Sequence, residues 1–322
     1  MENCVACALR KEHISEIVTL WNSNFDPCFH VDEAILLDKI LYDAELFRPG
    51  TFIFTYGGKI VGLIAAKLSK NGPPEFTDCG WISALLVDTP YRRKGLGRRM
   101  YLTAENELKK AGVKKVMAAG ELNNIFSGIP SPSLENMQFF ADLGFYLYDN
   151  NHYDVTADVS AIDFECLTVK KDDSPAFVTK PFSEGDEAKL NRFFHQEFPG
   201  RWQFEVMRYL EQGGDPDQVL LLCRDQEIKG FAKIQISHGG GIFAEQLGNF
   251  WGALGPIGIS KDLRGTGLGN RILFDALHCL KKKGARNVNI DWTVLTGFYG
   301  QFGFVPWRTY RGAYKYLRAA NR

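Results

Sequence analysis

Two short glycine-rich segments have residue types and spacing suited to binding an anion. Both follow the pattern R-x-x-G-x-G, and each lies between an apolar, strand-like run and a helix-like run. A glycine turn at such a junction directs unpaired backbone N–H groups and the positive end of the helix dipole toward one point, where phosphate is the usual ligand. Each could instead be only a tight turn, but two copies in matching contexts favour two phosphate sites. The segments are Arg92, Arg93, Lys94, Gly95, Leu96 and Gly97, and Arg264, Gly265, Thr266, Gly267, Leu268 and Gly269.

The elements that must position these segments also occur twice. Each half is expected to begin with a strand and an amphipathic helix, continue with a hairpin, and follow the glycine segment with a long helix and another strand. Both long helices end in lysines followed by glycine, as expected at a helix C-terminus. The matching stretches are 5–25 and 177–198, 52–62 and 219–231, and 113–119 and 287–291.

Each half then contains a short helical stretch that ends in Gly-Phe. Tyr299 begins the pattern Y-x-x-x-G-F in the second half, whereas Phe140 stands at that position in the first. A phenol can donate a proton and a phenyl ring cannot, so this substitution separates the halves chemically. We place the repeats at residues 1–168 and 175–322, with the polar segment 170–175 as a linker.

Composition narrows the class of protein. A chain of 322 residues favours two domains, and 38 basic against 38 acidic residues argue against a general nucleic-acid binder. No apolar run is long enough to cross a membrane and no signal pattern begins the chain, so we expect a cytoplasmic protein with no membrane partner. Seven scattered cysteines indicate reduced thiols, and the lone Cys4-x-x-Cys7 pair is a weak metal signal, so we expect no metal.

These motifs in this order resemble the GNAT N-acetyltransferase superfamily, present as a tandem pair over nearly the whole chain. The resemblance implies two α/β (α+β) domains, each a mixed, bent β-sheet flanked by helices. It also implies that the glycine segments bind the pyrophosphate of acetyl-CoA, and that main-chain groups of the preceding strand bind pantetheine and polarise the thioester. The matching strand positions are Leu85, Val87, Ile257 and Ile259.

By the same resemblance, Tyr299 protonates the departing coenzyme A thiolate. The second half is then the catalytic copy, and the first is a degenerate one that binds a coenzyme or only supports the fold. The general base is left open among Asp291, Glu121, Glu245 and ordered water.

The expected reaction moves an acetyl group from acetyl-CoA to a primary amine by direct attack in a ternary complex. The acceptor is a small-molecule amine, a peptide N-terminus or a lysine, and Arg201 is a candidate ligand for a carboxylate on it. The alternatives are a non-catalytic acyl-CoA-binding or scaffold protein, and activity in the first half. A monomer or homodimer is expected.

Overall fold

The computed structural model describes residues 4–131, 133–167, 174–237 and 240–317, so most of the expected linker, 170–175, lies outside the described residues. The chain forms two compact units. One contains residues up to 72, 76–153 and those from 308 onward, and the other contains 73–75 and 154–307. Among the described helices, none has both the length and the apolar character that crossing a membrane requires.

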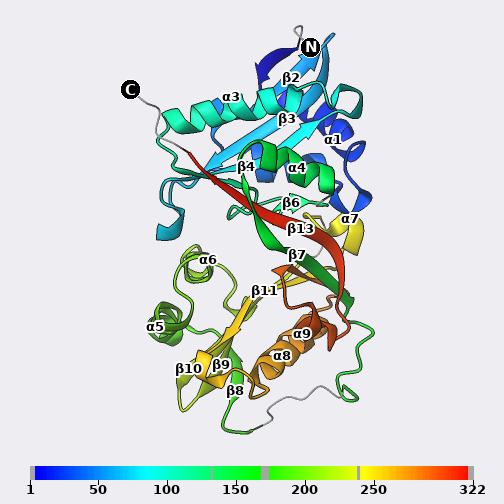
Figure 1. Cartoon of the computed structure of the whole chain (residues 1–322). Helices are drawn as coiled ribbons and strands as arrows, with labels where there is room; N and C mark the ends of the chain where they lie inside the picture. Colours follow the sequence, from blue (N-terminus) through cyan, green and yellow to red (C-terminus); the bar gives the residue numbers. More distant parts are fainter. Residues whose placement is uncertain (1–3, 132, 168–173, 238–239, 318–322) are drawn as a thin grey trace. The chain divides into compact units, whose positions relative to one another are not determined.

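The first unit is a mixed sheet with helices packed on it. Its strands lie in the order β1-β2-β3-β4-β5-β13, and β6 pairs with β13. Helix α3 lies across β2, β3 and β4 (Figure 1) and buries Met100, Ala104 and Leu108 completely against them. The strands are β1 Val5–Ala8, β2 Phe52–Tyr56, β3 Lys59–Leu68, β4 Cys79–Val87, β5 Lys115–Ala118, β6 Ile129–Pro130 and β13 Val305–Tyr316, and the helices are α1 Ile14–Asn22, α2 Glu33–Leu36, α3 Leu96–Lys110 and α4 Leu134–Asp142.

The second unit repeats this arrangement. Its strand order is β7-β12-β11-β10-β9-β8, and α8 packs on β10 and β11 as α3 packs on β3 and β4. A core of apolar side chains from α5, α6, β9 and β10 includes Phe194, Val206 and Phe231. The strands are β7 Tyr146–Asp158, of which only the part from Asp154 onward belongs to this unit, β8 Val178–Pro181, β9 Val219–Arg224, β10 Glu227–Ile236, β11 Gly252–Ile259 and β12 Asn287–Thr293, and the helices are α5 Glu187–Glu197, α6 Arg201–Glu211, α7 Ala244–Leu247, α8 Leu268–Lys282 and α9 Thr296–Gly300. The expected fold class is therefore confirmed.

In both units the two central parallel strands stay paired only briefly. β4 pairs with β5 over residues 79–82, and β11 pairs with β12 at Gly252 and Ala253. Beyond these pairs, β4 and β11 continue to Val87 and Ile259 while pairing with β3 and β10 on their other edges. The main chain that leads into each glycine segment therefore leaves its parallel partner just before the segment.

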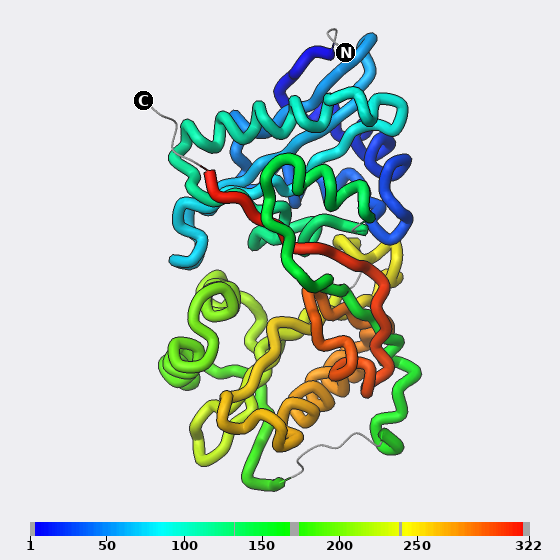
Figure 2. The backbone as a smooth tube through the Cα atoms, viewed as in Figure 1, coloured from blue at the N-terminus to red at the C-terminus, as the bar shows by residue number. Residues whose placement is uncertain are grey.

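The last strand of each sheet comes from the other half of the sequence. In the first unit β13 pairs with β5, for example Tyr314 with Met117, and the N–H of Leu317 donates to the carbonyl of Lys114 at 2.8 Å. In the second unit the N–H of Val159, just after β7, donates to the carbonyl of Arg286 at 2.7 Å. Figure 2 shows the red end of the chain running into the unit that the blue-to-green start of the chain forms. The repeat boundaries at residues 168 and 175 stay a prediction about the sequence, and the compact units exchange chain within β7 and β13.

This exchange predicts that a residue near the C-terminus stabilises the first unit. Tyr310 is 1% exposed, and its ring centroid lies 5.7 Å from that of Phe29. We expect Tyr310→Ala to destabilise the first unit by about 3–5 kcal/mol, because a large buried ring is removed. Hydrogen exchange read by mass spectrometry should show lost protection in β2, β3 and β4. Tyr310→Phe keeps the ring and is the control, and protection lost only in β9, β10 and β11 would contradict the assignment.

Candidate active site

The two glycine segments form the same strand-to-helix turn. α3 begins after Gly95, at φ 79°, and α8 begins after Gly267, at φ 99°, both in the left-handed region that favours glycine. Neither N-cap makes a side-chain hydrogen bond to its helix, in contrast to Ser133, which caps α4. In the described residues, the first turns of α3 and α8 thus lack the side-chain cap that would compete with an anion.

The basic side chains of the first segment are engaged within their own unit. The guanidinium of Arg92 donates from Nε to the carbonyl of Val87 at 2.9 Å and from Nη2 to Asn24 Oδ1 at 2.8 Å. Arg93 pairs with Glu135 at 3.2 Å, and Lys94 donates to the carbonyl of Pro90 at 2.8 Å. A phosphate there would have to compete with these contacts. In the second segment Arg264 is exposed, 6.0 Å from the ring centroid of Phe198.

The four expected strand positions all lie on β4 or β11 beyond the residues paired with β5 or β12. Val87 and Ile259 are buried, and Leu85 and Ile257 are half-buried. Their side chains therefore contribute to the core, and only their main chain is suited to a ligand. Their role in binding stays a prediction.

Tyr299 lies on α9 in an apolar setting. The residue is 5% exposed, and its ring centroid is 5.0 Å from that of Phe298 and 6.2 Å from that of Phe304. Burial, together with the negative charge of Asp291, raises the pKa of Tyr299 to about 12. The hydroxyl therefore keeps its proton near neutral pH, as a general acid must. Phe140 of α4 packs on Phe145 at a centroid distance of 5.3 Å and has no hydroxyl.

Asp291, near the end of β12, lies beside a bulge in β11. Lys233 of β10 faces two β11 residues there, Gly255 and Pro256. A Cβ on Gly255, whose φ is 152°, would lie 3.6 Å from Asp291 Oδ1. Asp291 is exposed, yet surrounding protein atoms desolvate its carboxyl group and raise its pKa, against the opposing positive charges of Arg201 and Lys233. Desolvation by nearby protein atoms affects the pKa of the carboxyl group, whereas solvent exposure determines access to it. Because Asp291 is exposed, a small molecule can reach its carboxylate.

Two further ionisable residues near Asp291 were not identified from the sequence. Burial raises the pKa of Glu205, which also feels Asp291, and burial lowers the pKa of Lys233, against the charges of Glu205 and Asp291. Lys233 Nζ lies 4.5 Å from the ring centroid of Tyr209. The sequence does contain a signal for each of them. Lys233 is a charged residue inside the apolar run 231–234, and Glu205 follows Arg201 by four residues on one helix.

Arg201, the expected carboxylate ligand, already has partners on its own unit. Its Nε donates to Glu205 Oε1 at 2.8 Å, and its guanidinium carbon lies 4.6 Å from the ring centroid of Trp292. The backbone N–H of Trp292 in turn donates to Asp154 Oδ1 at 3.1 Å. These contacts hold α6 against the end of β12, and an acceptor carboxylate would have to displace Glu205 from Arg201.

Strand register shows which residues of the first unit correspond to this group. Gly62 of β3 pairs with Val87, and Gly230 of β10 pairs with Ile259, so Gly62 and Gly230 occupy the same position in the two sheets. Three residues further along each strand, Ala65 therefore corresponds to Lys233. Gly80 of β4 pairs with Val116, and Gly252 of β11 pairs with Val288, so Val116 and Val288 occupy the same position. Three residues after them, Ala119 therefore corresponds to Asp291. With Phe140 in place of Tyr299, the first unit lacks all three polar side chains at the corresponding positions.

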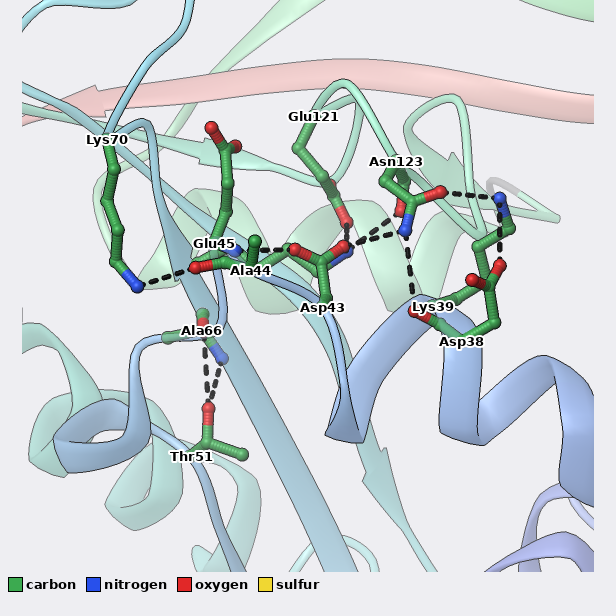
Figure 3. A network of polar contacts seen from close by, with 11 residues as sticks. Asp38, Lys39, Asp43, Ala44, Glu45, Thr51, Ala66, Lys70, Glu121 and Asn123 are labelled. Carbon is green, nitrogen blue, oxygen red and sulfur yellow. Dashed lines mark hydrogen bonds and ion pairs between the residues drawn. The ribbon is translucent and has the colours of Figure 1, made fainter. Parts of the chain in front are cut away.

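The first unit instead has a buried ionic network beyond the end of β5 (Figure 3). Lys67 Nζ lies 2.9 Å from Asp43 Oδ2 and 3.1 Å from Glu121 Oε1, and it donates to the carbonyl of Asn123 at 2.8 Å. The side chains of Lys67, Asp43 and Glu121 are at most 4% exposed. Glu121, one of the candidate bases, is thus paired and inaccessible.

The other sequence candidates lie apart from this chemistry. Glu245 is exposed on the short helix α7. Cys4 and Cys7 are free thiols, and within residues 4–131, 133–167, 174–237 and 240–317 no group of three metal-ligating side chains is present.

Comparison with known families supplies the decisive observation. The model of the acetyltransferase (GNAT) family matches residues 14–145 and again residues 188–304. The chain belongs to the acetyltransferase (GNAT) family. The two matches confirm the tandem arrangement that the repeated motifs predicted.

Solved structures show the same GNAT fold. The fungal "GCN5-related glucosamine N-acetyltransferase region" of a multi-domain β-N-acetylglucosaminidase matches at a TM-score of 0.81 and 18% identity. The match covers 97% of this chain but only 38% of the fungal chain. A "tandem GNAT protein from the clavulanic acid biosynthesis pathway" matches at a TM-score of 0.66 and 14% identity, with 99% of this chain and 100% of that chain covered.

A third structure was solved with an acyl-coenzyme A bound. Saccharomyces cerevisiae N-myristoyltransferase with myristoyl-CoA matches at a TM-score of 0.55 and 12% identity, with 99% of this chain and 80% of that chain covered. The search of curated proteins finds no match. At these identities the likenesses show the fold alone.

The buried network generates a stability prediction for the first unit. Lys67→Met would leave the carboxylates of Asp43 and Glu121 buried without their shared ammonium, at a cost of roughly 3–5 kcal/mol. Hydrogen exchange in β3 and β4 should report the loss. The control is Gln235→Met, the exposed counterpart on β10, which should change stability by less than about 0.5 kcal/mol. Equal effects of the two substitutions would show that the network is not stabilising.

Proposed function

We propose that this GNAT protein is an N-acetyltransferase that moves an acetyl group from acetyl-CoA to a primary amine, with the chemistry in the second unit. The observation that carries the proposal is that Lys233, Asp291 and Tyr299 correspond to Ala65, Ala119 and Phe140 in the first. The same fold therefore has ionisable groups beside the strand separation in one unit and methyl groups or a phenyl ring in the other.

In the proposed reaction the first turn of α8 and the segment 264–269 bind the pyrophosphate of acetyl-CoA. Main-chain groups of Ile257 and Ile259 bind pantetheine and stabilise the oxyanion, because β11 has left β12 by that point. The amine attacks the thioester carbon directly, and Tyr299 donates its proton to the thiolate as the C–S bond breaks. The first half, 1–168, is a degenerate copy that completes the fold.

Glucosamine is the first acceptor to test. The fungal region that matches over 97% of the chain is described as a glucosamine N-acetyltransferase, and carboxylates such as Asp291 and Glu205 suit an ammonium and hydroxyl groups. Lysine and a peptide N-terminus complete the panel. The rival function is an acyl-CoA-binding or scaffold protein, which would bind acetyl-CoA and release no coenzyme A with any amine.

A pair of matched substitutions tests which unit binds the coenzyme. A Cβ on Gly269 would meet no atom closer than 3.8 Å, and one on Gly97 none closer than 3.4 Å, so both sites tolerate a side chain. Gly269→Asp places a negative charge at the N-terminus of α8, which the helix dipole favours and a pyrophosphate does not. We expect calorimetry to show that Gly269→Asp has lost acetyl-CoA binding. Coenzyme A release should show that Gly97→Asp has kept its turnover. Unchanged affinity in Gly269→Asp would show that the segment is only a turn.

Tyr299→Phe tests the proposed acid. It keeps the ring, so the fold and coenzyme affinity should change little, while turnover should fall by about 10²–10⁴-fold, the usual contribution of a general acid. Coenzyme A release is measured at saturating acceptor, with Phe140→Tyr as the reciprocal variant that should create no activity. Retention of more than about a third of wild-type turnover would be far short of that contribution and would exclude Tyr299 as the acid.

A further inference from the structure

A glycine in β11 leaves room for an aromatic ring on the main chain of the candidate site. Gly258 lies between Ile257 and Ile259, and its φ is outside the left-handed region that favours glycine. A Cβ on Gly258 would lie 2.5 Å from Cζ of Phe198, so the tip of this ring rests on the strand. The close approach of the ring, rather than the backbone conformation, therefore explains the glycine.

The ring of Phe198 lies between the core of the second unit and its surface. Helices α5 and α6 cover one face of the second sheet and α8 covers the other (Figure 1). On the α5 and α6 face, the centroid of the Phe198 ring is 5.7 Å from that of Phe231 and 5.1 Å from that of Trp202. Phe231, which pairs with Gly258, is completely buried, whereas Trp202 is 38% exposed.

The opposite face of the strand is filled by the packing of α8. Side chains alternate along a strand, so Ile257 and Ile259 point away from Phe198. Cδ1 of Ile259 would lie 3.9 Å from a Cβ on Gly269, in the first turn of α8, and Leu268 of the same turn is 1% exposed. An acyl group on a thioester that this strand holds is therefore directed to the other face, where the ring lies.

A hydrogen bond that holds the loop before α6 has a counterpart in the first unit. The N–H of Lys261 donates to Glu197 Oε2 at 2.9 Å, and the N–H of Thr89 donates to Asn24 Oδ1 at 3.0 Å. Each donor lies two residues beyond the corresponding strand positions, 259 and 87. The residues that follow the two acceptors therefore correspond, and they are Phe198 and Phe25.

In the first unit a leucine stands where the second has this glycine. By strand register Leu86 corresponds to Gly258, and Leu86 is 3% exposed. Its side chain leaves no room for a ring to rest on the strand. Phe25 packs instead on Trp21 and Phe126, at centroid distances of 4.8 Å and 5.3 Å. A ring on the strand is thus specific to the unit proposed to carry the chemistry.

We propose that Phe198 limits the length of the acyl group that the second unit transfers, so that the site discriminates against acyl-CoA thioesters longer than acetyl-CoA. This rests on the proposed acetyltransferase function and adds the residue that sets acyl specificity. A thioester carbonyl bound to the main chain of Ile257 or Ile259 places the acyl carbons beside Gly258. A longer chain there meets the ring, and moving the ring gives up its packing on Phe231.

The test measures kcat/KM for acetyl-, propionyl-, butyryl- and hexanoyl-CoA in the full chain. Coenzyme A release is followed with one saturating amine that the wild type acetylates. One methylene in an apolar site changes specificity by about 10–200-fold, so the wild type should prefer acetyl-CoA to butyryl-CoA by at least about 10-fold. Phe198→Ala should raise the butyryl-to-acetyl ratio by about 10–200-fold, and Phe198→Leu should raise it less.

This ratio separates acyl specificity from stability. Loss of packing reduces the amount of active enzyme, which lowers both rates equally and leaves the ratio unchanged. Phe25→Ala, the corresponding substitution in the first unit, is the control and should keep the wild-type ratio. An unchanged ratio in Phe198→Ala, or a wild type that transfers butyryl as readily as acetyl, would overturn the proposal. A change confined to the KM of the amine would also overturn it, because the ring would then contact the acceptor.

Failure of the proposed function gives a different result. A wild type that binds acetyl-CoA but releases no coenzyme A with any amine would refute the acetyltransferase function. Calorimetry with acetyl-CoA and butyryl-CoA then decides on Phe198. Weaker binding of butyryl-CoA to the wild type that Phe198→Ala restores supports the limit on acyl length. Equal affinities in the wild type, or the same ratio of affinities in both proteins, overturn it, and binding of neither thioester overturns both proposals.

Discussion

The brief pairing of two parallel strands is the constraint on which the site depends. β11 shares hydrogen bonds with β12 at Gly252 and Ala253 and then continues beside β10 alone. A main chain without its strand partner leaves N–H and C=O groups that need other partners. A glycine turn and an uncapped helix follow directly, so one stretch of chain offers main-chain donors first along an extended strand and then at a helix N-terminus. An extended ligand that ends in phosphates matches this order of donors.

The two units treat the space beyond the separated strands differently. In the first, Lys67, Asp43 and Glu121 form a buried network whose members satisfy one another. In the second, Asp291 is exposed and the ionisable groups around it are half-buried or desolvated. A buried ion pair is costly to disrupt once formed, so the first arrangement resists opening to a ligand. The second keeps a carboxylate reachable at the cost of poorer solvation, which is typical of functional sites.

Much of the fold could be predicted from the sequence because its signals are local. The glycine segments, the helix ends and the tyrosine-to-phenylalanine difference are each read within a few residues. The roles of those residues remain predictions. The correspondence of Asp291 with Ala119 needed strand register, because the sequence alone had left both Asp291 and Glu121 as candidate bases. The exchange of β7 and β13 could not be predicted, because either strand could complete either sheet and the choice depends on contacts between distant segments.

That exchange gives a physical reason for both halves to be retained, even if only the second carries the proposed chemistry. Helix α9 carries Tyr299, and the chain continues from it through Phe304 into β13. β13 then supplies the buried residues Tyr310 and Ala313 to the first unit. Residues 154–158 in turn belong to the second unit, where Asp154 holds the backbone N–H of Trp292 next to Asp291. Each half thus provides chain that the other needs. Loss of the first half would remove Asp154 from beside Trp292 and Asp291, so the candidate site of the second unit depends on chain that the first half supplies.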